Sequence, residues 1–324
     1  VRHGLEVLAT TDKAGLVALK AVSDVDNRVT ARSVGFALGP RLNAAGRLGK
    51  ADNGFHLLTS VDLKEAKELA QELNVINQER KDIQKLVQDE AEYLIGREVN
   101  LEEDRVIVLA SENFHSGVVG IVASRVVEKY FRPAVLIALE NGVGKGSGRS
   151  IPHFNLHRAF TECARYLTQF GGHAYAAGLT INENNLDLFR NAINEVGRRI
   201  LSDENLVPEL FLDESIKISE IDATLNEQVT FLEPFGAENP SPVFLVQNIS
   251  VYRLKRIGRE ESHVRFQAVQ GDARIDAVGF NLAEEFTSID EKLDKVDLAC
   301  EFQVNDWGGR NKLELKVLDL RYSV

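Results

Sequence analysis

The sequence predicts an α/β domain followed by an all-β barrel, with a long helix ahead of both. From Arg105 to Leu201, strand-like apolar runs alternate with helical patterns, which is typical of a small α/β domain. Beyond residue 240, short alternating runs separated by turn residues replace that pattern, and five such strands indicate a small barrel of the OB type. Between residues 62 and 95, apolar residues recur at helical spacing.

The first 60 residues are predicted to form short helices joined by turns. One helix is expected over 12–22, and the Gly39-Pro40 pair predicts a break before a loop over 41–47. Asp62 and Glu65 resemble a capping box and predict the start of the long helix. A helix over 62–95 would be about 50 Å long at ~1.5 Å per residue. Because its middle is polar, we expect a connector over 61–98 that is dry at both ends and solvated between them.

The α/β domain is predicted over 99–203. Its expected elements are strands at 106–110, 134–139 and 179–181 and helices at 117–131, 155–167 and 185–201. The glycine-rich run 142–150 is predicted to be a loop. The barrel is predicted over 204–324, with turns at Gly258, Gly271-Asp272 and Trp307-Gly308-Gly309.

Composition favours a globular protein of the reducing cytoplasm. No apolar run is long enough to span a bilayer, the N-terminus lacks a signal segment, and Cys163 and Cys300 are outside any zinc or disulfide spacing. The chain begins at Val1 and contains no methionine. We therefore expect a piece of a longer protein, the alternative being that methionines were replaced.

The net charge of −11 argues against a protein that coats duplex DNA but leaves room for a local basic channel. Basic residues gather in two stretches, 125–165 and 253–265. Each stretch is either such a channel or an ordinary solvated face.

Four short motifs supply the candidate binding residues. In GPRLNAAGRLG (39–49), Arg41 and Arg47 could clamp a phosphate, with Asn43 as a hydrogen-bonding group, or could be surface arginines beside a helix cap. In FHSGVVGIVASR (114–125), His115 and Ser116 precede a helix whose first N–H groups favour an anion, although its glycines could serve packing alone.

The glycine-rich GKGSGRS (144–150) offers Lys145, Ser147 and Arg149 as phosphate donors. It lacks the spacing of a Walker loop, so the choice is between a non-nucleotide phosphate site and a solvated hairpin tip.

The segment GGHAYAAG (171–178) is the sharpest of the four motifs. Gly171 and Gly172 let the backbone pass close to a ligand, and His173 projects from the turn, where it could donate to a phosphate or orient an attacking group. A structural histidine is the alternative.

The predicted barrel adds a possible strand-binding face. Phe244 and Phe266 are expected in its interior, whereas Tyr252 and Trp307 could stack on bases. The neighbouring cations that could contact a phosphate backbone are Arg253, Lys255 and Arg256.

The motifs RLNAAGR, FHSGVVGIVASR, GSGRS and FGGHAYAAG, followed by PFGAENPSPVF (234–244), occur in the order found in RecJ-type exonucleases of the DHH phosphoesterase superfamily. The chain resembles that family over essentially its whole length. The resemblance implies that 1–60 end a DHH domain, 61–98 form the connector, 99–203 the DHH-associated domain and 204–324 the OB domain.

The resemblance also implies a function. Such enzymes degrade single-stranded DNA from the 5′ end in repair and recombination, with Mn²⁺ or Mg²⁺ held by aspartates and histidines of the DHH domain. By the same resemblance, Arg41, Ser147, Arg149 and His173 (the last as an auxiliary catalytic residue) face the 5′-phosphate, and His115 the nearby strand path. Single-stranded DNA is the expected partner, with a single-strand-binding protein or a helicase as further candidates and no membrane.

The sequence departs from the family where the metals should bind. It contains neither a DHH triplet nor a paired-aspartate motif, so we expect no metal site on this chain and no activity from it alone. Two other functions stay open: a non-catalytic single-strand-binding scaffold, and a phosphodiesterase for cyclic dinucleotides or short oligonucleotides. The OB domain argues against the second, because small substrates need no strand-tracking groove.

Overall fold

The computed structural model describes residues 1–48, 51–290, 294–305 and 312–323. Residues 4–209 form one compact unit, and residues 210–324 with 1–3 form another. The predicted fold class, an α/β domain and an OB-type barrel, is confirmed. No helix within the described residues is both long and apolar enough to cross a membrane.

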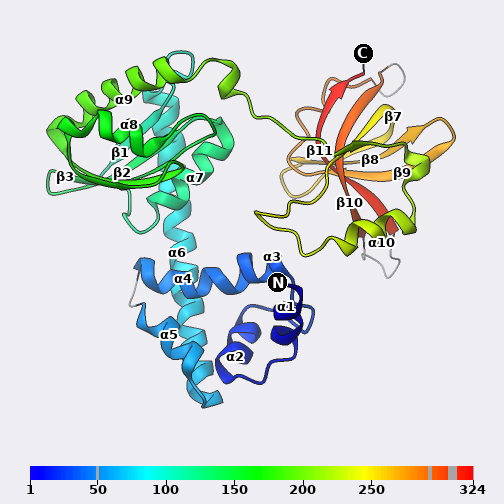
Figure 1. Ribbon diagram of the computed structural model, residues 1–324, viewed down its shortest axis with the longest axis horizontal. Coiled ribbons are helices and arrows are strands. Elements are labelled where there is room, and N and C mark those ends of the chain that lie inside the picture. Colours follow the sequence, from blue (N-terminus) through cyan, green and yellow to red (C-terminus); the bar gives the residue numbers. More distant parts are fainter. Residues whose placement is uncertain (49–50, 291–293, 306–311, 324) are drawn as a thin grey trace. The chain divides into compact units, whose positions relative to one another are not determined.

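The N-terminal helices pack on the first half of a very long helix (Figure 1). Asp62 accepts the N–H of Glu65 at 2.8 Å and caps the helix, as predicted. Leu19, Leu38 and Leu57 pack against Leu73 in one core. The helices of this part are α1 (Arg2–Ala9), α2 (Ala14–Val22), α3 (Ala31–Ser33), the π-helix Val34–Leu38, α4 (Gly39–Leu48), α5 (Asp52–Thr59) and α6 (Leu63–Glu98).

One sequence prediction for this part is wrong, and another holds only in part. Residues 41–47 belong to α4 and not to a loop, because the π-helical turn carries the chain through Gly39 and Pro40 without a break. The middle of α6 is solvated on one face only: Asn77 and Gln84 are 2% and 6% exposed, whereas residues 78, 79, 81 and 82 are exposed. Polar side chains are buried here because they hydrogen-bond to Arg80.

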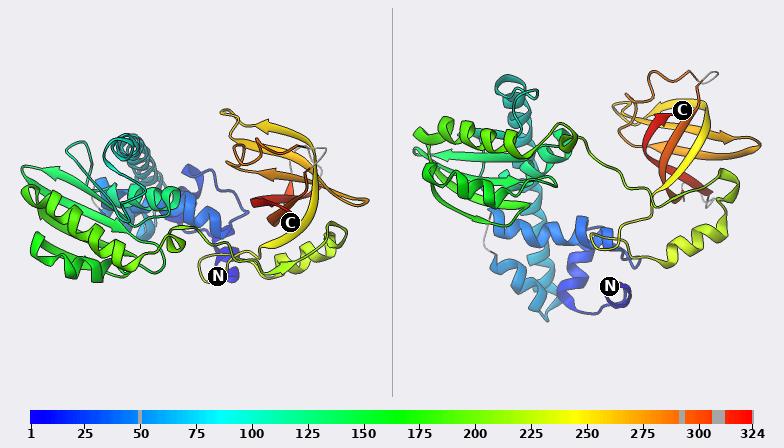
Figure 2. Two further views of the ribbon diagram at one scale, coloured as in Figure 1. Left: turned by 90° about the horizontal axis from the view of Figure 1, so that it is seen from above. Right: turned by 45° about the horizontal axis from the view of Figure 1, so that its top comes forward.

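The second half of α6 packs on an α/β domain with a five-stranded sheet ordered β1-β2-β3-β5-β4. One sheet face is covered by α7 and α6 and the other by α8 and α9 (Figures 1 and 2). The elements are β1 (Ile107–Ser111), α7 (Val119–Tyr130), β2 (Ala134–Glu140), β3 (Val143–Arg149), α8 (Leu156–Glu162), the 3₁₀ turn Ala164–Tyr166, β4 (Leu167–Gly172), β5 (Ala176–Asn182), the 3₁₀ turn Glu183–Asn185, α9 (Leu186–Ile200) and the 3₁₀ turn Glu204–Leu206.

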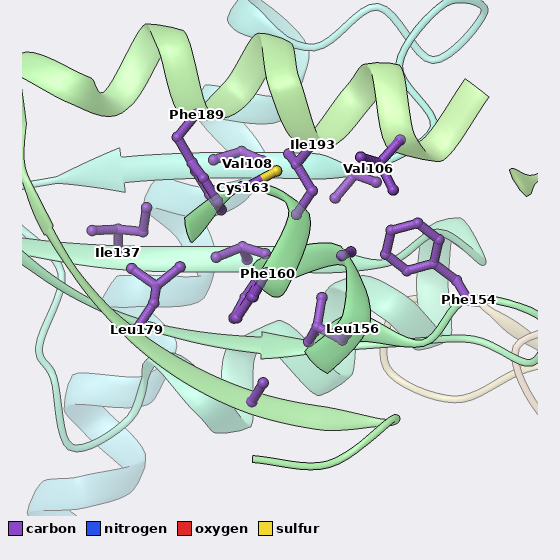
Figure 3. Packing of buried hydrophobic residues seen from close by; sticks show 14 of the residues in the cluster. Val106, Val108, Ile137, Phe154, Leu156, Phe160, Cys163, Leu179, Phe189 and Ile193 are labelled. Atoms are coloured by element: carbon purple, nitrogen blue, oxygen red, sulfur yellow. The ribbon is translucent and has the colours of Figure 1, made fainter. Parts of the chain in front are cut away.

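The glycine-rich run is an interior strand of this sheet and not a loop. Strand β3 pairs with β2 on one side and β5 on the other. Gly144, Gly146 and Gly148 all face the core that Figure 3 shows, where Leu156 and Phe160 approach the bare backbone. Side chains alternate along a strand, so Lys145, Ser147 and Arg149 face the other side, toward α7.

The C-terminal unit is a barrel closed by pairing between β7 and β10. All five predicted strands are present, and Phe244 and Phe266 lie in the interior as expected. The strands are β7 (Phe244–Ile257), β8 (His263–Gln270), β9 (Ala273–Gly279), β10 (Val296–Asn305) and β11 (Lys312–Tyr322), and before them come β6 (Glu214–Ser215), the 3₁₀ turn Ile218–Glu220 and α10 (Ala223–Phe231).

Candidate nucleic-acid interface

The start of α7 lies directly on the donor face of β3. Arg149 Nη1 donates to Ser147 Oγ at 3.0 Å and to the carbonyl of Gly148 at 2.8 Å. A Cβ at Gly120 would lie 2.9 Å from Ser147 Oγ and 3.0 Å from Arg149 Nη2. Glycine at 120 therefore lets the helix backbone come within contact distance of both polar side chains.

Arg47 brings a second guanidinium to this place from the end of α4. Its Nη1 donates to the carbonyl of Gly117 at 3.1 Å, just before α7 begins. A Cβ at Gly117 would lie 2.4 Å from the Arg47 carbonyl oxygen, so this approach also requires glycine. Burial, with the charge of Arg47 added to it, lowers the pKa of Arg149. The structure thus brings together Arg47, Ser147 and Arg149 from motifs that are about 100 residues apart in the sequence.

His115, Ser116 and Lys145 line a neighbouring cleft of about 550 Å³. The N–H of Gly117 donates to His115 Nδ1 at 3.0 Å, which orients the ring. Lys145 is on the same face of β3 as Ser147 and Arg149. Lys145 therefore places one wall of this cleft on the strand face that carries Ser147 and Arg149.

The GGH segment forms the hairpin that joins β4 to β5. Gly172 has a φ of +138°, a conformation that suits glycine, and His173 N donates to the carbonyl of Ala176 at 2.8 Å. The His173 side chain is exposed. Gly171 is paired with Gly178, which is paired in turn with Ser147. Beside Ser147, the sheet surface is therefore bare backbone.

Arg41 and Asn43 are not brought into this cluster. Arg41 donates to Asn74 Oδ1, the carbonyl of Ala37 and the carbonyl of Val22 at 2.8–3.0 Å. Burial lowers its pKa. All three nitrogens of Arg41 tie helices together, whereas Asn43 is exposed on α4. Arg41 and Arg47 therefore do not form one clamp as predicted, because the Arg41 guanidinium binds within the helices and the Arg47 guanidinium binds Gly117.

Two arginines that the sequence analysis did not select complete the cluster. Arg80, in the middle of α6, donates to Gln84 Oε1 at 2.7 Å and to Asn77 Oδ1 at 2.9 Å. Arg125, on α7, donates to Gln88 Oε1 at 3.1 Å. The signal in the sequence was the spacing of polar residues at 77, 80, 84 and 88, which puts them on one face of a helix.

On the barrel, Arg253 and Lys255 line a pocket of about 380 Å³. A bulge between Tyr252 and Lys255, with φ +56° at Arg253, turns this part of β7. The pocket is not purely basic, because Glu314 accepts from Arg265 at 2.7 Å and Asp276 accepts from Lys312 at 2.6 Å.

The remaining barrel candidates are divided. Tyr252 is 48% exposed and free of the core. Arg256 is directed elsewhere, since it donates to the carbonyl of Ala283 and to Thr287 Oγ1. Trp307 lies outside the described residues.

The described residues do not fit a divalent metal ion. No three His, Cys, Asp or Glu side chains cluster among them in a way that could hold one. Divalent Mg²⁺ and Mn²⁺ prefer carboxylate and other oxygen ligands, and the cluster above consists of cations. No step through a metal can therefore be assigned to these residues.

Residues 103–198 match the DHHA1 domain family and residues 212–319 the RecJ OB domain family. The chain is 35% identical over 323 residues to the single-stranded-DNA-specific exonuclease RecJ of Bacillus subtilis, covering 99% of this chain and 41% of that protein. It is 32% identical to the Escherichia coli enzyme of the same name, covering 94% of this chain and 54% of that protein. The chain thus spans about half the length of these relatives.

A solved structure of Thermus thermophilus RecJ in complex with Mn²⁺ superimposes with a TM-score of 0.85 at 28% identity. The alignment covers 99% of this chain and 46% of the Thermus chain.

Proposed function

Since the chain is a homologue of RecJ exonucleases over nearly its whole length and carries their DHHA1 and OB domains, we propose that it is the substrate-gripping part of a metal-dependent 5′→3′ single-strand exonuclease. In this proposal the chain binds the 5′-phosphorylated end and the strand behind it in DNA repair and recombination. The hydrolytic step needs carboxylate and histidine ligands of a DHH domain, whose triplet this sequence lacks.

The observation that carries the proposal is the convergence of Arg47, Ser147 and Arg149 beside a part of the sheet surface that has no side chains, at Gly171 and Gly178. The two guanidiniums offer fork-shaped donors, and the hydroxyl offers a third polar contact. Gly120 lets the α7 backbone approach Ser147, and Gly178 leaves bare backbone beside Ser147 on the sheet. A terminal phosphate, with its extra charge and free oxygens, suits such a site better than an internal phosphodiester.

The barrel supports the strand-binding half of the proposal. Tyr252 is exposed next to Arg253 and Lys255, which is the combination that OB folds use to stack a base and follow a backbone. Each stacked base contributes about 1–3 kcal/mol in such sites.

The test is the preference for a 5′-phosphate. Arg149→Gln should lower affinity for a 5′-phosphorylated single strand about 10- to 100-fold, because a charged hydrogen bond contributes about 1.5–3 kcal/mol. Affinity for the 5′-hydroxyl strand should change little. Arg158→Gln, an exposed arginine on α8, is the charge-matched control. Equal losses on both strands, measured by fluorescence anisotropy, would remove the end-binding assignment.

The chain alone is expected to be inactive. Incubation of the purified chain with radiolabelled single-stranded DNA and Mn²⁺ or Mg²⁺ should release no nucleotides above a mock purification. Metal-dependent release that co-elutes with the chain and is lost in Arg149→Gln would contradict this expectation.

A further inference from the structure

Four arginines on or near α7 have only neutral hydrogen-bond partners among the described residues. Arg47 donates to a carbonyl, Arg80 to two amide side chains, Arg125 to one amide and Arg149 to a hydroxyl and a carbonyl. Within the described part of the chain, no carboxylate forms an ion pair with any of them. All four are therefore oriented by neutral groups that leave their charge uncompensated.

The other arginines of the chain are of two kinds. Some also donate only to neutral groups in the part that the structure describes, as Arg41 and Arg132 do. Those that form ion pairs with Asp or Glu are Arg97, Arg105, Arg190, Arg199, Arg256, Arg265 and Arg321. In a chain of net charge −11, carboxylates are abundant. What distinguishes the four arginines is that they lie close to one another without a carboxylate among their described partners.

Helix α6 itself carries carboxylates, and two in its second half are directed to other partners. Glu90 accepts from Ser111 and Asn113, and Glu92 accepts from Lys129. At the positions that face the arginines, α6 instead presents Asn77, Gln84 and Gln88.

The four charges form a series. Arg80 and Arg125 donate to Gln84 and Gln88, which are one turn apart on α6, and Arg47 donates to the carbonyl of Gly117 just before α7. In keeping with this proximity, burial together with the charges of Arg47 and Arg125 lowers the pKa of Arg80. The series therefore runs from Arg149 on β3 through Arg47 on α4 to Arg80 on α6 and Arg125 on α7. Its first two members belong to the end-phosphate site proposed above.

The Arg80 side chain is held in a fixed orientation by its neighbours on α6. Its two terminal nitrogens are held by the buried Asn77 and Gln84, and its Nε is buried with no hydrogen-bond partner among the described atoms. Like charges held close together repel each other, and an anion between them removes that repulsion. Guanidinium forks match phosphate oxygens in geometry.

We propose that Arg80 and Arg125 form a second phosphate subsite, between α6 and α7, that holds the strand backbone behind the terminal nucleotide. This inference rests on the proposed function, because it continues the path that starts at Arg149 and Arg47. Asn77, Gln84 and Gln88 are its positioning residues. They orient the arginines without competing for the phosphate, as a carboxylate would.

The test compares phosphorylated oligothymidylates of different length. Affinities of 5′-phosphorylated thymidine mono-, di-, tetra- and octanucleotides are measured by displacement of a fluorescent strand, at several salt concentrations. The variants are Arg125→Gln, whose side chain is exposed, and Arg80→Gln, with thermal unfolding as a check on folding. Lys64→Gln, exposed on the same helix and about 24 Å from Arg80 at ~1.5 Å per residue, is the control.

For both arginine variants we expect mononucleotide affinity within twofold of the unsubstituted chain and about tenfold weaker binding of the tetranucleotide. The slope of log affinity against log salt should fall by about 0.7 for each phosphate that the variant no longer neutralises. The ratio between 5′-phosphate and 5′-hydroxyl strands should not change. Affinities that match Lys64→Gln at every length, or an equal loss on the mononucleotide, would overturn the second subsite.

A failure of the proposed 5′-phosphate site would give a different result from a failure of the second subsite. If the unsubstituted chain shows no preference for a 5′-phosphate, the end-binding proposal fails. The length-dependent loss in Arg125→Gln on 5′-hydroxyl strands would still decide whether the second subsite exists.

Discussion

At the residue scale, the geometry of the candidate site depends on a glycine, Gly120, which has no side chain. Gly120 is the point at which α7 meets Ser147 and Arg149, and a single methyl group there would lie within 3.0 Å of both. Contacts this short force the neighbours to move, and both neighbours are side-chain ends that can do so. The positions of Ser147 Oγ and Arg149 Nη2, which are donors of the proposed end-phosphate site, therefore depend on how closely the helix backbone approaches them.

Gly120→Ala should therefore weaken 5′-phosphate binding severalfold while changing the free energy of unfolding by less than about 1 kcal/mol. The displaced donors lower affinity, and the better helix propensity of alanine, worth about 1 kcal/mol, offsets the steric cost. Gly96→Ala on α6, where a Cβ meets nothing within 4 Å, is the matched control. A large fall in stability, measured by urea unfolding, would show that the contact is part of the core instead.

The two cysteines make a second prediction at this scale. Burial is the main reason that the pKa of Cys163 rises to about 11 and that of Cys300 to about 12. Both thiols should stay protonated at pH 8 and resist iodoacetamide in the folded chain, but react within minutes in urea. Mass spectrometry of the alkylated chain measures this. Rapid modification of either cysteine without denaturant would contradict its burial.

At the scale of elements, strand β3 shows what the sequence could and could not predict. Glycine at every second position looked like a loop because glycine is rare inside strands. The alternation itself was a strand signal, since one bare face lets α8 pack close while the other carries Lys145, Ser147 and Arg149. The barrel strands were predictable because their apolar residues alternate in the usual way.

The site was harder to predict than the fold. The sequence pointed to Ser147, Arg149 and Arg47 through their motifs, but their proximity depends on α4 meeting α7, which no local pattern encodes. Arg80 was missed because a polar stretch in a helix normally faces water. Here one face of that stretch is buried, so the amides of Asn77 and Gln84 could only be recognised from the tertiary structure.

The two faces of β3 predict opposite effects for neighbouring substitutions. Gly144→Val should destabilise the chain by about 1–3 kcal/mol, because a Cβ there already lies 2.5 Å from Ile137 Cγ2. Lys145→Val should leave stability nearly unchanged, since valine suits a strand, but weaken strand binding. Urea unfolding and anisotropy titrations separate the two. Similar losses of stability in both variants would mean that β3 does not have one core face and one binding face.

At the scale of the whole molecule, each unit has its own core and its own way of holding charge. In the α/β unit the uncompensated arginines gather at one place, where binding of an anion would stabilise the folded state. In the barrel unit the charge to be explained is a buried carboxylate, which is held by hydrogen bonds from the protein itself. Asp297 is 4% exposed and lies in the bulge of β10, at the seam where β10 pairs with β7 to close the barrel.

Asp297 joins three strands or their ends. It accepts from the N–H of Asn248 at 3.1 Å, from Arg321 Nε at 3.2 Å and from Ser323 Oγ at 2.6 Å. Burial alone would raise the pKa of Asp297, but these hydrogen bonds and the charge of Arg321 lower it overall. The ionised carboxylate therefore stabilises closure of the barrel.

Because the folded pKa lies below the unfolded value, this stabilisation is fully present above about pH 4 and is lost as the pH falls through the folded pKa. Asp297→Asn should lower the melting temperature at pH 7 and flatten its dependence on pH between 5 and 3. Asp272→Asn, an exposed carboxylate in the turn between β8 and β9, should retain the profile of the unsubstituted chain. Circular dichroism gives the melting temperatures, and hydrogen exchange should assign the loss at low pH to peptides of β7 and β10. A profile for Asp297→Asn that is parallel to the control at every pH would mean that the closing seam does not depend on the ionised carboxylate.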